Sequence, residues 1–117
     1  MLRLTRVRPA EAVLFRTAEE AWFWAMAVLM ARHDGGGTAW RPTGAHRACD
    51  PEDVFNCLDR LYRARKIELA HARVLRLWGE RQVAPSGSCP HQRREWRVWQ
   101  QAMAELEWSL RGRRIVG

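Results

Sequence analysis

Cysteine and histidine are the first residues whose spacing could support chemistry, because both bind metals. The chain has 3 Cys and 4 His. Cys89 stands close to His91, and His46 stands close to Cys49. Structural zinc sites normally combine two pairs of closely spaced cysteines or histidines. The sequence has no second pair with the Cys-x-x-Cys or His-x3-His spacing that is usual in zinc fingers. We therefore expect no metal, although Cys49, Cys89 and His91 leave this question open.

Other patterns fall short of a catalytic or phosphate-binding site. His33-Asp34 begins like a metal-dependent hydrolase signature, but no further constellation of His and Asp follows it. The glycines at 35–37 follow a predicted helix instead of a strand, which favours a turn over a phosphate loop. One loop holds nucleophiles and a base without an evident acid partner: Ser86, Ser88, Cys89 and His91. We expect that the protein is not an enzyme, needs no cofactor and has no small-molecule substrate.

Arginine is the dominant charged residue, and its distribution is uneven. The formal net charge is +7, and only Lys66 among the 20 basic residues is a lysine. Residues 1–59 contain 7 Arg against 8 acidic residues, whereas residues 60–117 contain 13 Lys+Arg against 5. Such asymmetry indicates a polyanionic partner, and guanidinium groups suit phosphate and guanine contacts. A GC-rich genome would give the same arginine preference without any function, so that alternative stays open.

Tryptophan is the second abundant residue that could carry recognition, with 7 copies. Trp78 and Trp99 fall at helical spacing on apolar stripes and are expected in the core. Trp40 lies in a predicted loop, and Trp108 falls off the apolar stripe of its helix, so both are expected at the surface. Exposed tryptophans stack on bases or anchor protein partners. Trp40 and Trp108 are therefore candidate partner-binding residues.

Periodicity and capping signals predict the helices that position these side chains, at residues 17–34, 50–65, 68–82 and 92–110. Thr17 with Glu20 forms a capping box, and Asp50 with Pro51 gives a cap followed by a first-turn proline. The run from 21 to 31 is apolar on nearly every side, so the first helix is expected to be central. The inward stripes of the other helices are expected to be Val54, Leu58, Leu61 and Tyr62; then Ile67, Val74, Leu77 and Trp78; then Trp99, Met103, Leu106 and Leu110.

These elements predict an all-α single domain over 1–117, a compact bundle of about four helices with a helix-turn-helix-like C-terminal half. Residues 1–16 are expected to be an arm or short strand, and residues 113–117 a basic tail. The longest apolar run is about half of the roughly 20 residues that a membrane-spanning helix needs, so no membrane partner is expected. The odd number of cysteines fits a reducing cytoplasm.

The basic second half supplies the candidate nucleic-acid contacts. Arginines crowd the beginning of the last helix, where a recognition helix presents side chains to the major groove and where cations oppose the helix dipole. If the arginines after residue 60 share one outer surface, the candidate residues are Arg73, Arg76, Arg93, Arg94, Arg97, Gln100, Gln101, Arg113 and Arg114. A merely solvated basic face is the alternative interpretation.

Two segments also resemble a known family. Residues 68–79, with Arg73-Val74-Leu75, resemble the first conserved helix in region 4 of bacterial sigma-70 factors. Residues 93–111 are similar to the recognition helix of that domain. The resemblance omits the middle helix of the family, for which 85–92 is too short. It implies a helix-turn-helix relative whose DNA-facing positions are the arginines and glutamines at the start of the last helix.

The leading hypothesis is a small helical protein that binds nucleic acid, duplex DNA in preference to RNA, in a role associated with transcription. The alternative is an interaction module that docks on a larger protein complex through exposed tryptophans. The role of residues 1–49, the base specificity and the oligomeric state are not determined by the sequence.

Overall fold

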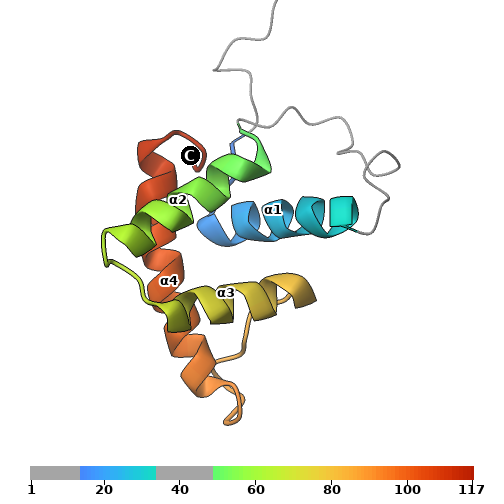
Figure 1. The fold of residues 1–117 in the computed structure, drawn as a ribbon. Helices are drawn as coiled ribbons and strands as arrows, with labels where there is room; N and C mark the ends of the chain where they lie inside the picture. The colour runs from blue at the N-terminus through green and yellow to red at the C-terminus, as the bar shows by residue number, and fades with distance from the viewer. Residues whose placement is uncertain (1–13, 34–48) are drawn as a thin grey trace, which may run out of the picture.

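The computed structural model describes residues 14–33 and 49–117. In this part the chain forms four helices (Figure 1), namely α1 (Ala18–His33), α2 (Pro51–Arg63), α3 (Leu69–Arg81) and α4 (Arg93–Gly112). The predicted all-α class is confirmed, and the helix bounds agree with the prediction to within two residues at each end. Trp40 and His46, like the other predictions on 1–13 and 34–48, lie outside the described residues.

Side chains near the helix starts satisfy backbone N–H groups that have no partner within the helix. Thr17 Oγ1 accepts from the Glu20 N–H at 3.1 Å, while Glu20 Oε1 accepts from the Arg16 N–H at 2.8 Å. At α2 the Asp53 carboxylate accepts from the Asp50 N–H at 2.9 Å. These local bonds explain why the starts of α1 and α2 were predictable from their sequences.

α1 contacts α2, α3 and α4, and α4 likewise contacts each of the other three helices. In Figure 1, α1 and α3 run in the same direction, and α4 crosses the beginnings of both. Contact with three helices is expected for an element that is apolar on almost every side, although Leu29 of α1 is 41% exposed. The chain folds back from α2 into α3 through 64–68, and the longer segment 82–92 joins α3 to α4.

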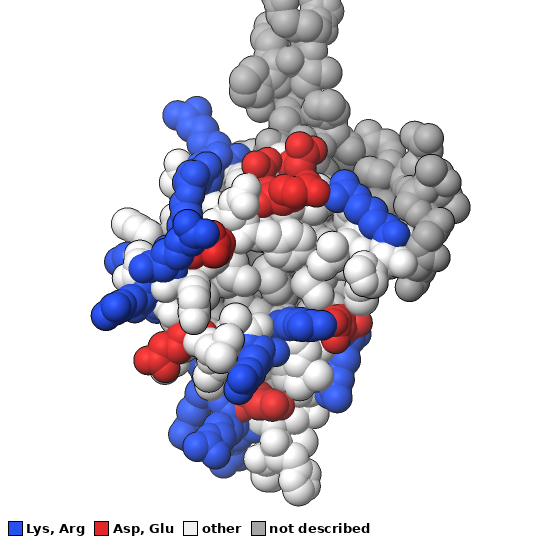
Figure 2. All heavy atoms as spheres, viewed as in Figure 1, with Lys and Arg blue, Asp and Glu red and all other residues white. Residues whose placement is uncertain are grey.

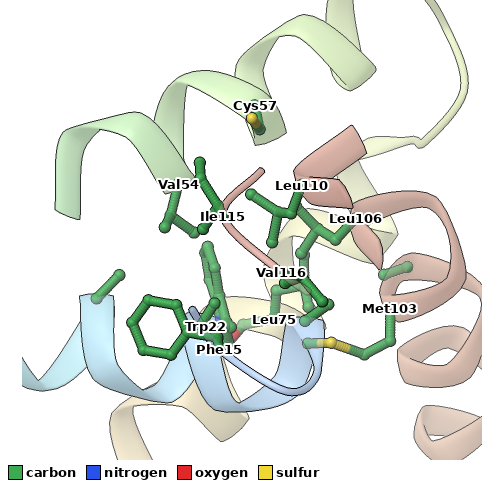
Figure 3. Close-up of a cluster of buried hydrophobic side chains, with 14 of the residues drawn as sticks. Phe15, Trp22, Val54, Cys57, Leu75, Met103, Leu106, Leu110, Ile115 and Val116 are labelled. Carbon is green, nitrogen blue, oxygen red and sulfur yellow. The ribbon is translucent and has the colours of Figure 1, made fainter. Parts of the chain in front are cut away.

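The core draws on every helix and on both flanking segments (Figure 3). Its fully buried larger side chains are Trp99, Phe15, Leu75, Leu106, Leu110, Val54 and Cys57. Cys57, on the inner side of α2, is 1% exposed and packs as a small hydrophobic side chain. Trp78 and Met103 are buried as predicted.

Two inward positions were predicted wrongly. Leu77 is 36% exposed, and the fully buried leucine of α3 is Leu75. Tyr62, predicted on the buried face of α2, is 48% exposed. Each lies at the edge of its helix's apolar stripe, and a rotation of about one residue, near 100°, moves such a position into solvent.

Residues 113–117 do not form a free tail. Arg114 adopts a left-handed conformation with φ 61°, which turns the chain so that Ile115 and Val116 return to the core, each 3% exposed. The Phe15 N–H donates to Ile115 O at 3.0 Å, and the Gly117 N–H donates to Phe15 O at 2.9 Å. An isolated parallel bridge between Phe15 and Val116 thus joins the segment before α1 to the segment after α4.

Within the described residues, no helix combines the length and the apolar character needed to cross a membrane.

Candidate nucleic-acid interface

The outward side of α4 carries most of the predicted contact residues. Burial of Trp99, Met103, Leu106 and Leu110 fixes the rotation of this helix, because positions three and four apart share one face. The exposed positions, which we call the basic face of α4, are Arg93, Arg94, Arg97, Gln100, Gln101, Ala104, Trp108, Arg111 and Gly112. This face therefore contains four arginines, two amides and one tryptophan, and no carboxylate.

The acidic residues of α4 border this face instead of standing on it. Glu95, Glu105 and Glu107 are each half-buried. Glu107 Oε1 accepts from the Ala18 N–H at 2.8 Å, at the positive end of the α1 dipole. Its other oxygen pairs with Arg111 at 2.7 Å. The Glu107 carboxylate is thus engaged in the contact between α4 and α1, and the exposed residues of the outer face remain positively charged.

Arg93, Arg94 and Arg97 are all exposed at the N-terminal end of α4. Arg93 Nε makes one long bond, 3.4 Å, to Gly87 O. Among the residues that the structure describes, none of these three guanidinium groups has an ion pair. Cations here oppose the helix dipole, so their position does not stabilise the helix.

The two glutamines of the basic face differ. Gln100 is exposed without a hydrogen bond to another described residue, whereas Gln101 Oε1 lies 3.0 Å from His71 Nε2. His71 Nδ1 accepts from the Glu68 N–H at 3.0 Å, which places the imidazole proton on Nε2 and makes it the donor to Gln101. Gln101 therefore joins α4 to α3 in addition to facing solvent.

Arg73 and Arg76 lie on the outer side of α3 instead of on the basic face of α4. Arg73 has no ion pair with a described residue. Arg76 Nε pairs with Glu80 Oε2 at 3.3 Å, so its charge is partly balanced one turn along the same helix.

Arg113 and Arg114 follow the other end of α4. The 20 residues of this helix, at a rise of about 1.5 Å each, separate them from Arg93 by about 30 Å. Figure 2 likewise shows basic side chains along one border, across the middle and at the lower end of the view, with acidic ones between them. The expectation of one common basic surface is not met, because the arginines after residue 60 are spread over α2, the turn after it, α3, α4 and the segment after α4.

Trp108 is 80% exposed, as predicted for a residue off the apolar stripe. It lies on the basic face of α4, about four turns from Arg93. Its partner in the prediction, Trp40, lies outside the described residues.

Cys49 and Cys89 are half-buried and Cys57 is buried. In residues 14–33 and 49–117, no group of three His, Cys, Asp or Glu side chains is arranged to hold a metal ion.

One further feature had no sequence signal. A groove of about 570 Å³ opens between α1, α2 and α3. Trp22, Met26, Phe55 and Leu58 line its interior, and Arg76 lies among its polar lining residues. The spacing of residues within one helix predicts which of its sides is apolar. A groove between three helices depends on the angles at which they cross, which the spacing does not give.

No protein-family model matches the chain, and searches of curated proteins and of solved structures found no significant similarity. The resemblance of residues 68–111 to sigma-70 region 4 stays a prediction.

Proposed function

We propose that the protein binds duplex nucleic acid, DNA in preference to RNA, through the N-terminal half of the basic face of α4. The observation that supports this most directly is that Arg93, Arg94 and Arg97 share an exposed helix end and have no ion pair with a described residue. The hypothesis is narrower than the one drawn from the sequence, because Arg73, Arg76, Arg113 and Arg114 are not part of this surface.

The shape of α4 supports duplex DNA over duplex RNA. Figure 1 shows its N-terminal end extending beyond α3. The major groove of B-DNA is about 12 Å wide and admits an α-helix, whereas that of A-form RNA is too deep and narrow for side chains to read. Gln100, one turn beyond Arg97, is the residue of this face suited to an adenine edge. A binding role also fits the expectation that the protein is not an enzyme.

The test is a titration of the full chain with a short DNA duplex at salt concentrations between about 50 and 200 mM. Binding in the nanomolar-to-micromolar range should weaken steeply with salt, because phosphate contacts release counterions. Replacing Arg93, Arg94 and Arg97 together by Ala should remove most of the binding. It should also reduce the slope of log K against log salt by about 3, roughly 1 for each phosphate contact.

A charge-matched control separates this site from general attraction. Arg60, Arg63 and Lys66 are exposed on α2 and the turn after it, and their joint replacement by Ala removes the same charge. That control should bind DNA within about threefold of the parent. Equal binding by the parent and the Arg93/Arg94/Arg97 variant at low salt would show that the site is assigned wrongly.

Exposure of Trp108 favours a second candidate function, docking on a protein partner. A large aromatic side chain at the surface is typical of the residues that dominate interface energies. This candidate predicts that the parent retains one specific protein in a pulldown, that Trp108→Ala loses it, and that no DNA shift occurs at about 50 mM salt. A DNA shift unaffected by Trp108→Ala supports the first candidate instead.

A further inference from the structure

The groove between α1, α2 and α3 is lined mainly by apolar side chains whose positions are fixed by the core. Trp22 and Met26 form its base and are only 2% and 4% exposed. Trp22 Nε1 donates to Leu75 O at 2.9 Å, and the Trp22 ring meets Phe55 edge to face at 5.4 Å between centroids. The base of the groove is therefore already formed in the free protein.

The polar groups of the groove lie among the lining residues contributed by α3 and the end of α1. They are Arg76, Glu80 and His33. Arg76 uses its Nε for Glu80, at the long distance of 3.3 Å, and its side chain is 79% exposed. A guanidinium group has five N–H donors, so the two terminal nitrogens of Arg76 remain available to an oxygen of a bound molecule.

We propose that this groove binds a small amphipathic carboxylate, with its apolar body on Leu29, Met30 and Phe55, above the buried Trp22 and Met26, and its anionic head on Arg76. The volume of about 570 Å³ falls within the roughly 300–1,000 Å³ of small-molecule sites. A few polar groups beside an apolar interior are the arrangement that orients such ligands. Figure 2 looks onto this side of the molecule, where uncharged residues cover most of the area between α2 and α3. The inference does not depend on nucleic-acid binding.

Decanoate is a suitable probe, and the uncharged alcohol decanol is its matched comparison. We expect one saturable site in calorimetric titration of the full chain below the micelle concentration of decanoate. Arg76→Gln should weaken decanoate binding about tenfold, the effect of one charge-assisted hydrogen bond, and leave decanol binding unchanged. Arg73→Gln, which removes the same charge from α3 outside the groove, should leave both affinities unchanged.

A second pair of variants tests the location. Ala72 lines the groove, so Ala72→Leu should reduce the affinity for both probes. Ala104→Leu adds the same atoms to the exposed face of α4 and should not. Thermal unfolding of each variant checks that it is folded. If Ala72→Leu does not fold, Arg76→Gln still tests the proposal, because it changes only an exposed side chain.

Three results would overturn the proposal. The parent could fail to bind decanoate saturably, or Arg76→Gln and Arg73→Gln could bind it equally well. Sedimentation could also show that the parent is a dimer which Ala72→Leu dissociates, in which case a second copy covers the groove.

Discussion

Two glutamates accept hydrogen bonds from other helices, and these bonds affect which charged side chains remain at the surface. Glu107 caps the start of α1 through the Ala18 N–H, and Glu19 Oε2 accepts from the indole N–H of Trp99 at 2.8 Å. Both bonds join residues far apart in the sequence and direct these carboxylates into contacts between helices, although Glu107 also pairs with Arg111 through its other oxygen. Arg93, Arg94 and Arg97 have no ion pair among the described residues. The positive character of the basic face of α4 is therefore a consequence of packing as much as of composition.

A carboxylate outside this network gives a prediction about pH. The pKa of Glu52 is lowered from 4.5, first because its carboxylate accepts from its own backbone N–H in the first turn of α2, and second because it bonds Arg32 at 2.6 Å. The folded state thus binds this proton more weakly than the unfolded state. Glu52 adds stability above about pH 4.5 that is lost as the pH falls through its lower folded value.

Urea unfolding at several pH values measures this contribution. Glu52→Gln should be less stable than the parent near neutral pH and should approach it below about pH 4. Arg32→Gln should show the same trend more weakly, because the larger cause does not involve Arg32. A constant difference between Glu52→Gln and the parent at all pH values would contradict the assignment.

At the scale of the elements, the sequence predicted the existence and the limits of the helices better than their rotation. Helix starts depend on neighbouring residues, such as Asp50 with Asp53, and these are visible in a linear pattern. The rotation of α3 is not local. Leu75 and Leu77 are both apolar, and contact with the other helices determines which of them is buried.

The candidate site also has parts that the sequence predicted and parts that it did not. The cluster at the start of α4 and the exposure of Trp108 follow from a single helical period, so the sequence was sufficient to place them. The separation of Arg113 and Arg114 from this cluster follows from the length of the last helix, so the sequence was sufficient to expect it. The return of Ile115 and Val116 to the core could not be predicted, because it depends on their pairing with Phe15. The groove also lacked a signal, since three helices contribute to it.

Close approach of α3 to α1 gives a prediction about packing. A Cβ atom added at Gly79 would lie 2.7 Å from Trp22 Nε1 and 2.8 Å from Met26 Cγ. Gly79→Ala should therefore destabilise the protein by about 1–3 kcal/mol through overpacking, despite the higher helix propensity of alanine. Denaturant unfolding measures the change.

Gly112 provides the matched control, because a Cβ atom there would have no neighbour within 4 Å. Gly112→Ala should be neutral, or stabilising by up to about 1 kcal/mol. Similar destabilisation by both substitutions would indicate a backbone effect instead of a steric one.

For the whole molecule, the segments before α1 and after α4 are structural parts of the core. Ile115→Ala should destabilise the protein by about 2–5 kcal/mol, as expected for a buried isoleucine. Val83→Ala, at a residue that is 52% exposed, should change stability by no more than about 0.5 kcal/mol. Equal effects in denaturant unfolding would mean that residues 115–117 do not pack as described.

The bridge between Phe15 and Val116 has a consequence for how the protein opens. Amide protons close to the limits of a folded region usually exchange with solvent by local fraying, well below the global unfolding free energy. Here the Phe15 and Gly117 N–H groups are hydrogen-bonded across the bridge, beside fully buried side chains. Their hydrogen exchange should be nearly as slow as that of the core amides of α4, because releasing either segment exposes the interior that both segments cover.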